Sequence, residues 1–201
     1  GLPANNNNGN SGSDNGTPTG NDNDGNITPD NIPDSCDEAT PHQSGDVSST
    51  YYADAEVLVL SSKTAGDTYD MFQVELWQRY GAPTSPGAYP IEAANYSDCT
   101  TCLLVFAGCT ESAQGRSCEK TYLAQAGTIY VDTIGSVGEQ LKVRFENTVL
   151  AESNIDFQSY NSTLVPNGDI WCADGSQYDF EATIGVPEQA PVDGTDTTDT
   201  T

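Results

Sequence analysis

The chain has 201 residues, 30 of them acidic and 6 basic, which gives a formal net charge of −24 at neutral pH. Its 35% of hydrophobic residues is enough for one core. Residues 47–185 hold 18 of the acidic residues and all of the basic ones, so the acidity is not confined to the chain ends. A field of this sign repels phosphate backbones and anionic lipid surfaces, which argues against nucleic acid as a partner. No apolar run has the length of a transmembrane helix.

The first 46 residues form a low-complexity segment, rich in Asn, Gly, Asp and Ser and poor in apolar side chains. A segment of this composition cannot bury enough apolar surface to offset the entropy lost on ordering. We therefore expect residues 1–46 to form a linker or stalk. The chain begins Gly-Leu-Pro-Ala without Met. We therefore expect the mature form of an exported protein, from which a signal peptide has been removed.

Two sets of acidic side chains are candidates for calcium. Asp22, Asp24 and Asn26 have the spacing of the first ligands of an EF-type loop, but the twelfth position, where that loop needs Glu, is a proline. Asp169 and Asp174 lie near a turn late in the domain and form the second set. Polar low complexity and solvated strand ends explain both sets more simply. We expect no cofactor, with calcium as the alternative.

Residues 47–185 alternate apolar and polar side chains in several places, as strands with one buried face do. About seven to nine short strands in this length favour an all-β fold, an antiparallel β-sandwich or jelly roll. No window shows a helical stripe, and residues 118–126 allow at most two helical turns. The predicted faces and strands are Phe72/Val74/Leu76, Leu141/Val143/Phe145, Val149/Ala151/Ile155/Phe157, Phe180/Ala182/Ile184, Ala55–Leu60, Cys102–Phe106 and Thr128–Thr133.

Residues 186–201 return to a polar composition that ends in an Asp/Thr-rich run. They predict a second tail without a core of its own. The expected organisation is therefore a linker over residues 1–46, one β domain over residues 47–185 and a tail over residues 186–201.

Six cysteines, an even number, favour an oxidising compartment. The Cys-x-x-Cys spacing also occurs in zinc and redox sites, but the second close pair of a zinc ribbon and the βαβ context of a redox site are missing. We expect disulfides, of which Cys109–Cys118 is the best single pair, because the polar segment between them is able to close a hairpin. The candidate cysteines are Cys36, Cys99, Cys102, Cys109, Cys118 and Cys172.

Nucleophilic catalysis of the Ser-His or Cys-His kind would have to use His42, because it is the single histidine of the chain. It lies in a polar stretch before the first predicted strand, so we expect an exposed loop histidine and no catalytic residue. Carboxylate-pair hydrolysis stays open, because 30 acidic residues always offer candidates and their presence discriminates nothing.

Trp77 is the best candidate for contact with a glycan. It points away from the predicted buried face of Phe72, Val74 and Leu76, so it is available as a stacking platform. Trp171, beside Cys172, is expected in the core instead. Asn-x-Ser/Thr motifs mark candidate glycosylation sites at Asn15, Asn26, Asn95 and Asn161.

A loose pattern of cysteines and neighbouring residues runs through the second half of the chain: Cys99-x-x-Cys102-Leu-Leu-Val, Cys109, Cys118, Gly127-Thr-Ile and Trp171-Cys172. It resembles uncharacterised bacterial surface lipoproteins, in which a polar linker separates a lipidated cysteine from a β domain. The resemblance implies export to the cell surface and assigns no activity. Residue 1 is Gly, so a lipid anchor, if the protein has one, is not in this chain.

The leading hypothesis is a secreted, non-enzymatic structural or adhesive protein of the cell surface, including the subunit of a surface filament. Its partner would be a second copy, another surface protein or a glycan, with edge strands as assembly elements. The alternatives are a glycan-binding module, with or without calcium, and a secreted hydrolase that uses carboxylates.

Overall fold

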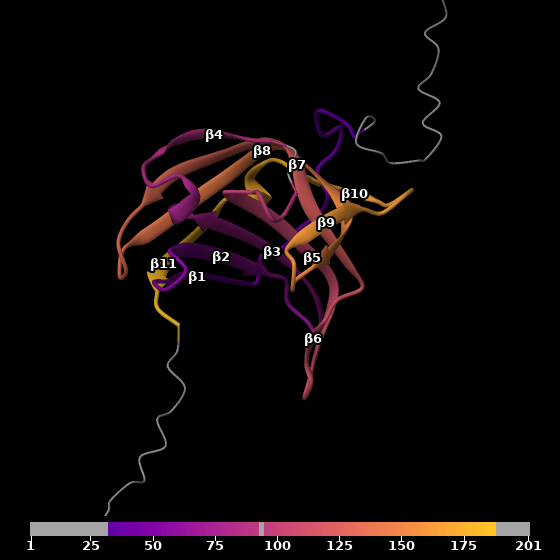
Figure 1. The fold of residues 1–201 in the computed structure, drawn as a ribbon, viewed down its shortest axis with the longest axis horizontal. Coiled ribbons are helices and arrows are strands. Elements are labelled where there is room, and N and C mark those ends of the chain that lie inside the picture. The colour runs from indigo at the N-terminus through magenta and orange to yellow at the C-terminus, as the bar shows by residue number, and fades with distance from the viewer. Residues whose placement is uncertain (1–31, 93–94, 188–201) are drawn as a thin grey trace, which may run out of the picture.

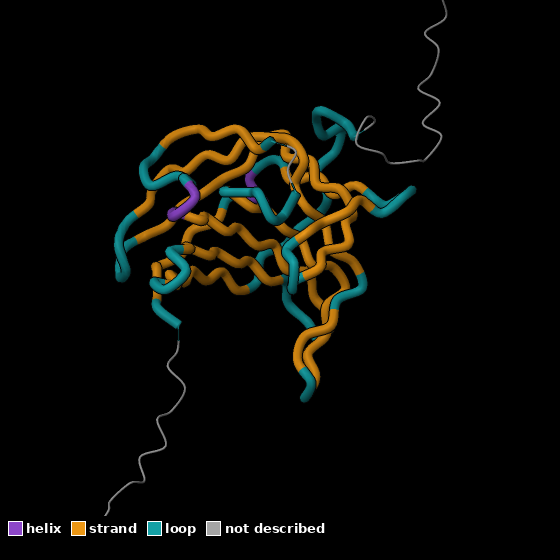
Figure 2. Tube along the Cα trace, viewed as in Figure 1, coloured by secondary structure: helices purple, strands orange, loops and turns teal. Residues whose placement is uncertain are grey.

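The computed structural model describes residues 32–92 and 95–187, and within them the chain is all-β, as the sequence predicts (Figure 1, Figure 2). These residues form 11 strands of one mixed sheet and two short 3-10 turns, η1 (Gln78–Tyr80) and η2 (Ser176–Tyr178). None of their helices has the length and hydrophobicity needed to cross a bilayer. The strands are β1 (Asp46–Tyr52), β2 (Val57–Lys63), β3 (Thr68–Trp77), β4 (Gly87–Ile91), β5 (Thr101–Ser112), β6 (Gly115–Ser117), β7 (Lys120–Ile134), β8 (Gln140–Asp156), β9 (Asn161–Leu164), β10 (Ile170–Ala173) and β11 (Phe180–Gly185).

The sheet curls into two layers, and hydrogen bonds between neighbouring strands continue from one layer to the other and back to form a closed ring. Its order is β10-β8-β11-β1-β2-β3-β5-β7-β4, and β7 also pairs with β8, which closes the ring. Figure 1 shows β1, β2 and β3 in one layer and β4 and β8 in the layer above it. β1 and β11 run parallel, unlike their other pairings. The predicted antiparallel sandwich is therefore a mixed, sandwich-like sheet.

Inward-facing side chains from both layers form the main core. Two of the four predicted alternations, in the first half of β8 and in β11, are confirmed, because their apolar faces are buried and the opposite faces are not. On β3 the predicted face of Phe72, Val74 and Leu76 is buried, but Met71 and Glu75 on the opposite face are buried as well. The fourth differs, since Val149, Leu150 and Ala151 are all fully buried and β8 has no wet face there. Phe157 follows the end of β8 and is 53% exposed.

β7 and β8 form a long hairpin that bends where the sheet passes from one layer to the other. Register shifts interrupt the pairing between Ala124 and Thr128. Gly127, at the bend, has φ +132°, and a Cβ there would lie 2.5 Å from Thr148 Cα. Only a glycine fits so close an approach at that backbone angle. The segment 118–126, which the sequence allowed as a short helix, belongs mostly to β7.

A second, smaller cluster covers the outer face of β3, β5 and β7. It includes Tyr69, Met71, Tyr96, Leu104 and Phe106. Tyr96 comes from the loop before β5, and Ile155 near the end of β8 packs against the same cluster. The outer faces of β1 and β2 contribute nothing to this cluster, and the two clusters together therefore leave part of the sheet open.

Residues 36–45, which we call the strap, run along the edge strand β10 before β1 begins. The Thr40 N–H donates to the carbonyl of Cys172 at 2.9 Å, and the Cys172 N–H donates to Thr40 Oγ1 at 2.9 Å. His42 follows in the strap and is 3% exposed. Packed structure therefore begins ahead of the boundary predicted at residue 47. The calcium candidates Asp22, Asp24 and Asn26 and the glycosylation candidate Asn15 lie outside the described residues.

Candidate functional site

The open part of the sheet forms a groove with a volume of about 500 Å³. Tyr96, Tyr160 and Arg116 stand along its side and belong to the loop before β5, the β8–β9 turn and β6. Its floor consists of outward side chains of β1, β2 and β3, among them Ser48, Thr50, Tyr52, Val57, Val59, Ser61, Gln73, Glu75 and Trp77.

One end of the groove deepens into a pocket of about 350 Å³ walled by aromatic rings. Trp77 from the end of β3, Tyr80 from η1, Tyr96 and Tyr160 line it. The Trp77 and Tyr80 rings lie 6.2 Å apart, and the Tyr96 and Tyr160 rings 6.1 Å apart. Trp77, Tyr96 and Tyr160 line the groove as well, so the groove and the pocket are one continuous surface.

A buried carboxylate lies under these rings. Glu75 on β3 is 6% exposed and accepts hydrogen bonds from Gln73 Nε2 at 2.6 Å, Trp77 Nε1 at 3.0 Å and the Tyr96 hydroxyl at 3.0 Å. Burial, followed by the charge of Glu75, raises the pKa of the Tyr96 phenol, so Tyr96 stays protonated and donates. Glu75 thereby fixes the orientation of two rings of the pocket.

Two loops that are far apart in sequence are joined at the pocket rim. The Asn95 side chain donates to the Ser162 carbonyl at 3.1 Å and accepts the Ser162 N–H at 2.9 Å. The neighbouring β8–β9 turn is held by Asp156, whose pKa is lowered by hydrogen bonds from Ser159 and from the backbone. Tyr160 ends this turn with φ +59°, a left-handed conformation that is unusual for a bulky residue.

A strained backbone at Tyr160 aims its ring into the pocket, and such strain persists only where the surroundings fix it. The loop before β5, which carries Tyr96, is fixed covalently, because Cys99 in this loop lines the pocket and forms a disulfide with Cys102. Both walls are therefore preorganised, which lowers the entropy cost of binding a ligand.

The predicted cysteine pair Cys109–Cys118 is confirmed as a disulfide at the base of the β5–β6 hairpin. Cys99–Cys102 is a second bond, so this Cys-x-x-Cys motif is structural. Cys36 and Cys172 are free thiols in the described structure. The expectation that all six cysteines are bonded is thus met by four of them.

The second calcium candidate is divided between two places. Asp169 precedes β10 and pairs with Lys120, whereas Asp174 follows β10 and accepts the Asn147 N–H at 3.0 Å. At about 3.3 Å per residue the two lie about 16 Å apart along the strand, too far to share an ion. Residues 32–92 and 95–187 hold no group of three or more side chains suited to a metal.

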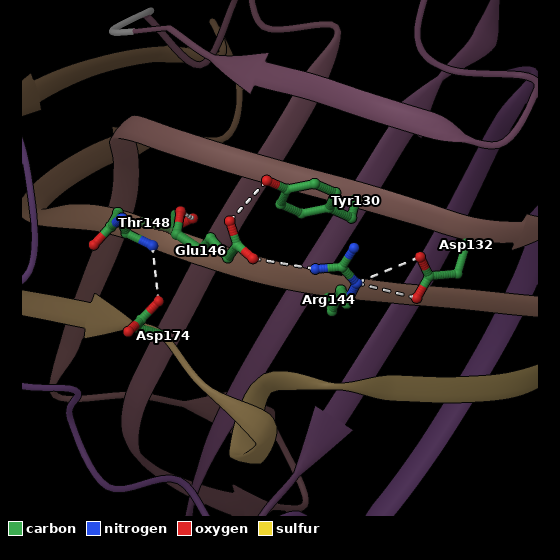
Figure 3. A network of polar contacts seen from close by, with 7 residues as sticks. Tyr130, Asp132, Arg144, Glu146, Thr148 and Asp174 are labelled. Atoms are coloured by element: carbon green, nitrogen blue, oxygen red, sulfur yellow. Dashed lines mark hydrogen bonds and ion pairs between the residues drawn. The ribbon is translucent and has the colours of Figure 1, made fainter.

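A polar network on β7 and β8 occupies the outer surface near Asp174, as Figure 3 shows. Arg144 pairs with Asp132 at 3.3 Å and with Glu146 at 3.2 Å, and the Tyr130 hydroxyl donates to Glu146 at 2.7 Å. The carboxylates of this network are thus engaged with a cation, and none of its residues lines the groove.

His42 is buried, which corrects the expectation of an exposed loop histidine. Its ring stacks on Tyr178 with centroids 5.7 Å apart, and Nε2 lies 3.0 Å from Ser62 Oγ. Burial lowers the pKa of the imidazole, so the buried ring is neutral. Although a histidine next to a serine resembles a nucleophile and its base, Ser62 is fully buried and out of reach of a substrate.

The glycosylation candidates Asn95 and Asn161 differ in accessibility. Asn161 is exposed at the start of β9, whereas the Asn95 amide is half-buried and bonded on both its oxygen and its nitrogen. Trp77 faces the groove, as its position opposite the buried face of β3 predicts. Tyr96 and Tyr160 were missed, because only the fold brings their segments together, whereas Glu75 was missed although it shares the outer face of β3 with Trp77.

Comparison with known proteins identified no similarity: no family model, no curated protein and no solved structure matches the chain.

Proposed function

We propose that the chain is an exported, non-enzymatic adhesive domain that binds an uncharged glycan in the groove over β1, β2 and β3. The observation that carries this proposal is the continuous aromatic surface formed by Trp77, Tyr96 and Tyr160 at the end of a groove whose floor also carries hydroxyl and amide side chains. Aromatic faces stack on the apolar faces of sugar rings, while hydroxyl and amide side chains on the floor bond the sugar hydroxyls.

The length of the groove suits a chain rather than a single sugar. Its floor follows β3 from Met71 to Trp77, a distance of about 20 Å at the usual rise per residue. The pocket at one end then holds a terminal or side-branch ring between aromatic walls.

Charge favours an uncharged ligand. The groove lining contains one carboxylate, the buried Glu75, and one cation, Arg116, while the domain around it has an excess of acidic residues. An anionic glycan would be repelled by the surrounding field and would meet a single arginine. One carboxylate also falls short of the pair that glycoside hydrolysis uses, so binding fits this lining better than cleavage.

Self-assembly by strand addition fits the same structure less well. The edge strand β4 contains Pro90, which has no N–H to donate to an added strand. At the other end of the strand order, β10 is bonded to the strap through Thr40, and the two strands off this order, β6 and β9, are only 3 and 4 residues long. Adhesion through the groove therefore replaces filament assembly as the preferred form of the surface-protein hypothesis.

Export is supported by the two disulfides, Cys99–Cys102 and Cys109–Cys118, which form and persist in oxidising compartments. A stalk of polar residues before the domain would hold the groove away from a surface, as the resemblance to surface lipoproteins implies.

A panel of immobilised neutral and acidic polysaccharides, probed with the full chain in calcium and in chelator, tests the proposal. We expect retention on at least one neutral polysaccharide, independent of calcium. Trp77→Ala should weaken it at least about tenfold, because it removes one stacking face. Tyr160→Gly should weaken it as well while relieving the left-handed strain, and so separates binding from stability.

Tyr130→Ala is the matched control, because Tyr130 is an aromatic residue of the outer network that lies away from the groove. Retention on no neutral polysaccharide, or equal loss in the Tyr130 and Trp77 variants, would refute the proposal. Retention restricted to acidic polysaccharides would refute the charge argument.

A further inference from the structure

The strap places the two free thiols next to one another. Cys36 Sγ donates to the Thr148 carbonyl at 3.3 Å, and Thr148 pairs with Ala173, the neighbour of Cys172, across β8 and β10. The Cys172 thiol also contributes to the raised pKa of the Cys36 thiol, as expected of two neighbouring sulfur groups. The two side chains therefore point toward the same spot, although 136 positions separate them in the sequence by the difference of their numbers.

Contacts that do not involve sulfur hold the strap in this place. Thr40 exchanges two hydrogen bonds of 2.9 Å with the backbone of Cys172, and the Tyr178 hydroxyl donates to the Thr40 carbonyl at 2.6 Å. His42 is then buried beside Tyr178. The approach of Cys36 to Cys172 thus follows from the packing of the whole strap.

The surroundings of the two thiols fit a structural bond rather than a reactive or metal-binding site. Burial raises the pKa of both thiols, which makes them poor nucleophiles. The part of the chain that the structure describes contains no metal-ligating group of three around them. The four remaining cysteines are already paired with one another.

We propose that Cys36 and Cys172 are joined by a third disulfide in the native protein. Two thiols lose two protons and two electrons as the sulfur–sulfur bond forms. The oxidant is the disulfide of a thiol oxidoreductase or of a small thiol, which is reduced to two thiols in the exchange. This inference is independent of the groove, because neither cysteine lines it.

The bond would fasten the strap to β10 covalently. Pulling on the N-terminal end of the chain would then load the Cys36–Cys172 bond at the rim of the sheet, instead of peeling the strap and β1 from β2. Closing a loop of this length also restricts the unfolded chain more than the two short loops do.

Trypsin separates this bond from the others cleanly. Cleavage after the lysines and arginines puts Cys36 in residues 1–63 and Cys172 in residues 145–201, whereas Cys118 lies alone in residues 117–120 and the remaining three cysteines lie in residues 80–116. Mass spectrometry of the unreduced digest of the full chain, exported into an oxidising compartment, should find 1–63 linked to 145–201.

Alkylation of the unfolded, unreduced chain supplies a second measurement. We expect no labelled cysteine in the native chain and one labelled cysteine, Cys172, in Cys36→Ser. The thermal midpoint of Cys36→Ser should also fall by several degrees. Two labelled cysteines at Cys36 and Cys172 in the native chain, or a link of residues 1–63 to residues 80–116, would overturn the inference.

Discussion

Glu75 connects the stability of the domain with the shape of its groove. A buried carboxylate is costly unless its oxygens are hydrogen-bonded, and here Gln73, Trp77 and Tyr96 supply the donors. These donors are neutral, so the charge itself is not compensated by a cation within the described residues. The side chain therefore holds two aromatic walls in place at an energetic cost to the fold.

Replacing Glu75 by Gln tests this role. An amide presents its own N–H groups to one of the three donors, which leaves that donor buried without an acceptor. We expect the free energy of unfolding in urea to fall by about 1–3 kcal/mol. Glu181→Gln is the control, because Glu181 is exposed on β11, and it should change the same quantity by less than about 0.5 kcal/mol. Equal effects in the two variants would contradict the assigned role.

His42 gives the domain a pH dependence of known sign. Burial lowers the pKa of the imidazole below its ordinary 6.5, and this outweighs the charge of Asp70, which acts in the opposite direction. As the pH falls through 6.5, the unfolded chain takes up a proton that the folded chain does not. The free energy of unfolding should then fall with pH, by at most about 1.4 kcal/mol per pH unit, until the folded pKa is reached.

His42→Phe isolates this contribution. Phenylalanine fills the same place against Tyr178 and does not titrate. Urea unfolding of both proteins between neutral pH and pH 5 should show that the free energy of unfolding falls more steeply in the native chain. The carboxylates are common to both proteins, so the difference in slope belongs to His42. Parallel pH profiles would show that His42 is not the group responsible.

At the scale of the elements, the β7–β8 hairpin bends at the place where the sheet passes from one layer to the other. Gly127 sits at this bend against Thr148 and Gly115 sits at the exposed β6 turn, and both have positive φ. A Cβ at residue 127 would meet backbone, whereas a Cβ at residue 115 would meet nothing within 4 Å. The two glycines therefore share a conformational requirement and differ in crowding.

Gly115→Ala should cost about 1–2 kcal/mol of unfolding free energy, from the left-handed backbone alone. Gly127→Ala should cost clearly more, because Thr148 must also move and the β7–β8 pairing with it. Chemical unfolding of the two variants side by side makes the comparison. A cost at residue 127 equal to that at residue 115 would show that the close approach is relaxed in solution.

Strand positions were predictable where one face is wet, as in β11 and the first half of β8, because burial then follows a period of two. On β3 only the inner face followed the prediction, because the second cluster covers the outer face. The prediction failed for residues 149–151, where both faces are dry, and for residues 118–126, where a short apolar run did not reveal its period. The candidate site was predictable only through Trp77. Its partners Tyr96 and Tyr160 lack a local signal, because only the fold brings their segments to β3. Glu75 shares the outer face of β3 with Trp77, but its burial depends on those distant segments.

At the scale of the whole molecule, charge distinguishes the groove from the rest of the surface. Most of the acidic side chains face solvent, and they keep the surface hydrated and repel anionic partners. The groove and its pocket are nearly free of charge by comparison, with Arg116 and the buried Glu75 as their charged residues. The protein thus combines an acidic surface that repels anions with a groove that offers aromatic faces and hydrogen-bonding side chains.

The contact between sugar and Trp77 is the central claim of this account, and fluorescence measures it directly. The chain has two tryptophans, and Trp171 is buried with its Nε1 bonded to Tyr178. In Trp171→Phe the emission comes from Trp77 alone, and titration with neutral oligosaccharides should change it saturably for at least one sugar. An emission that stays constant across the panel, up to millimolar sugar, would contradict the claim.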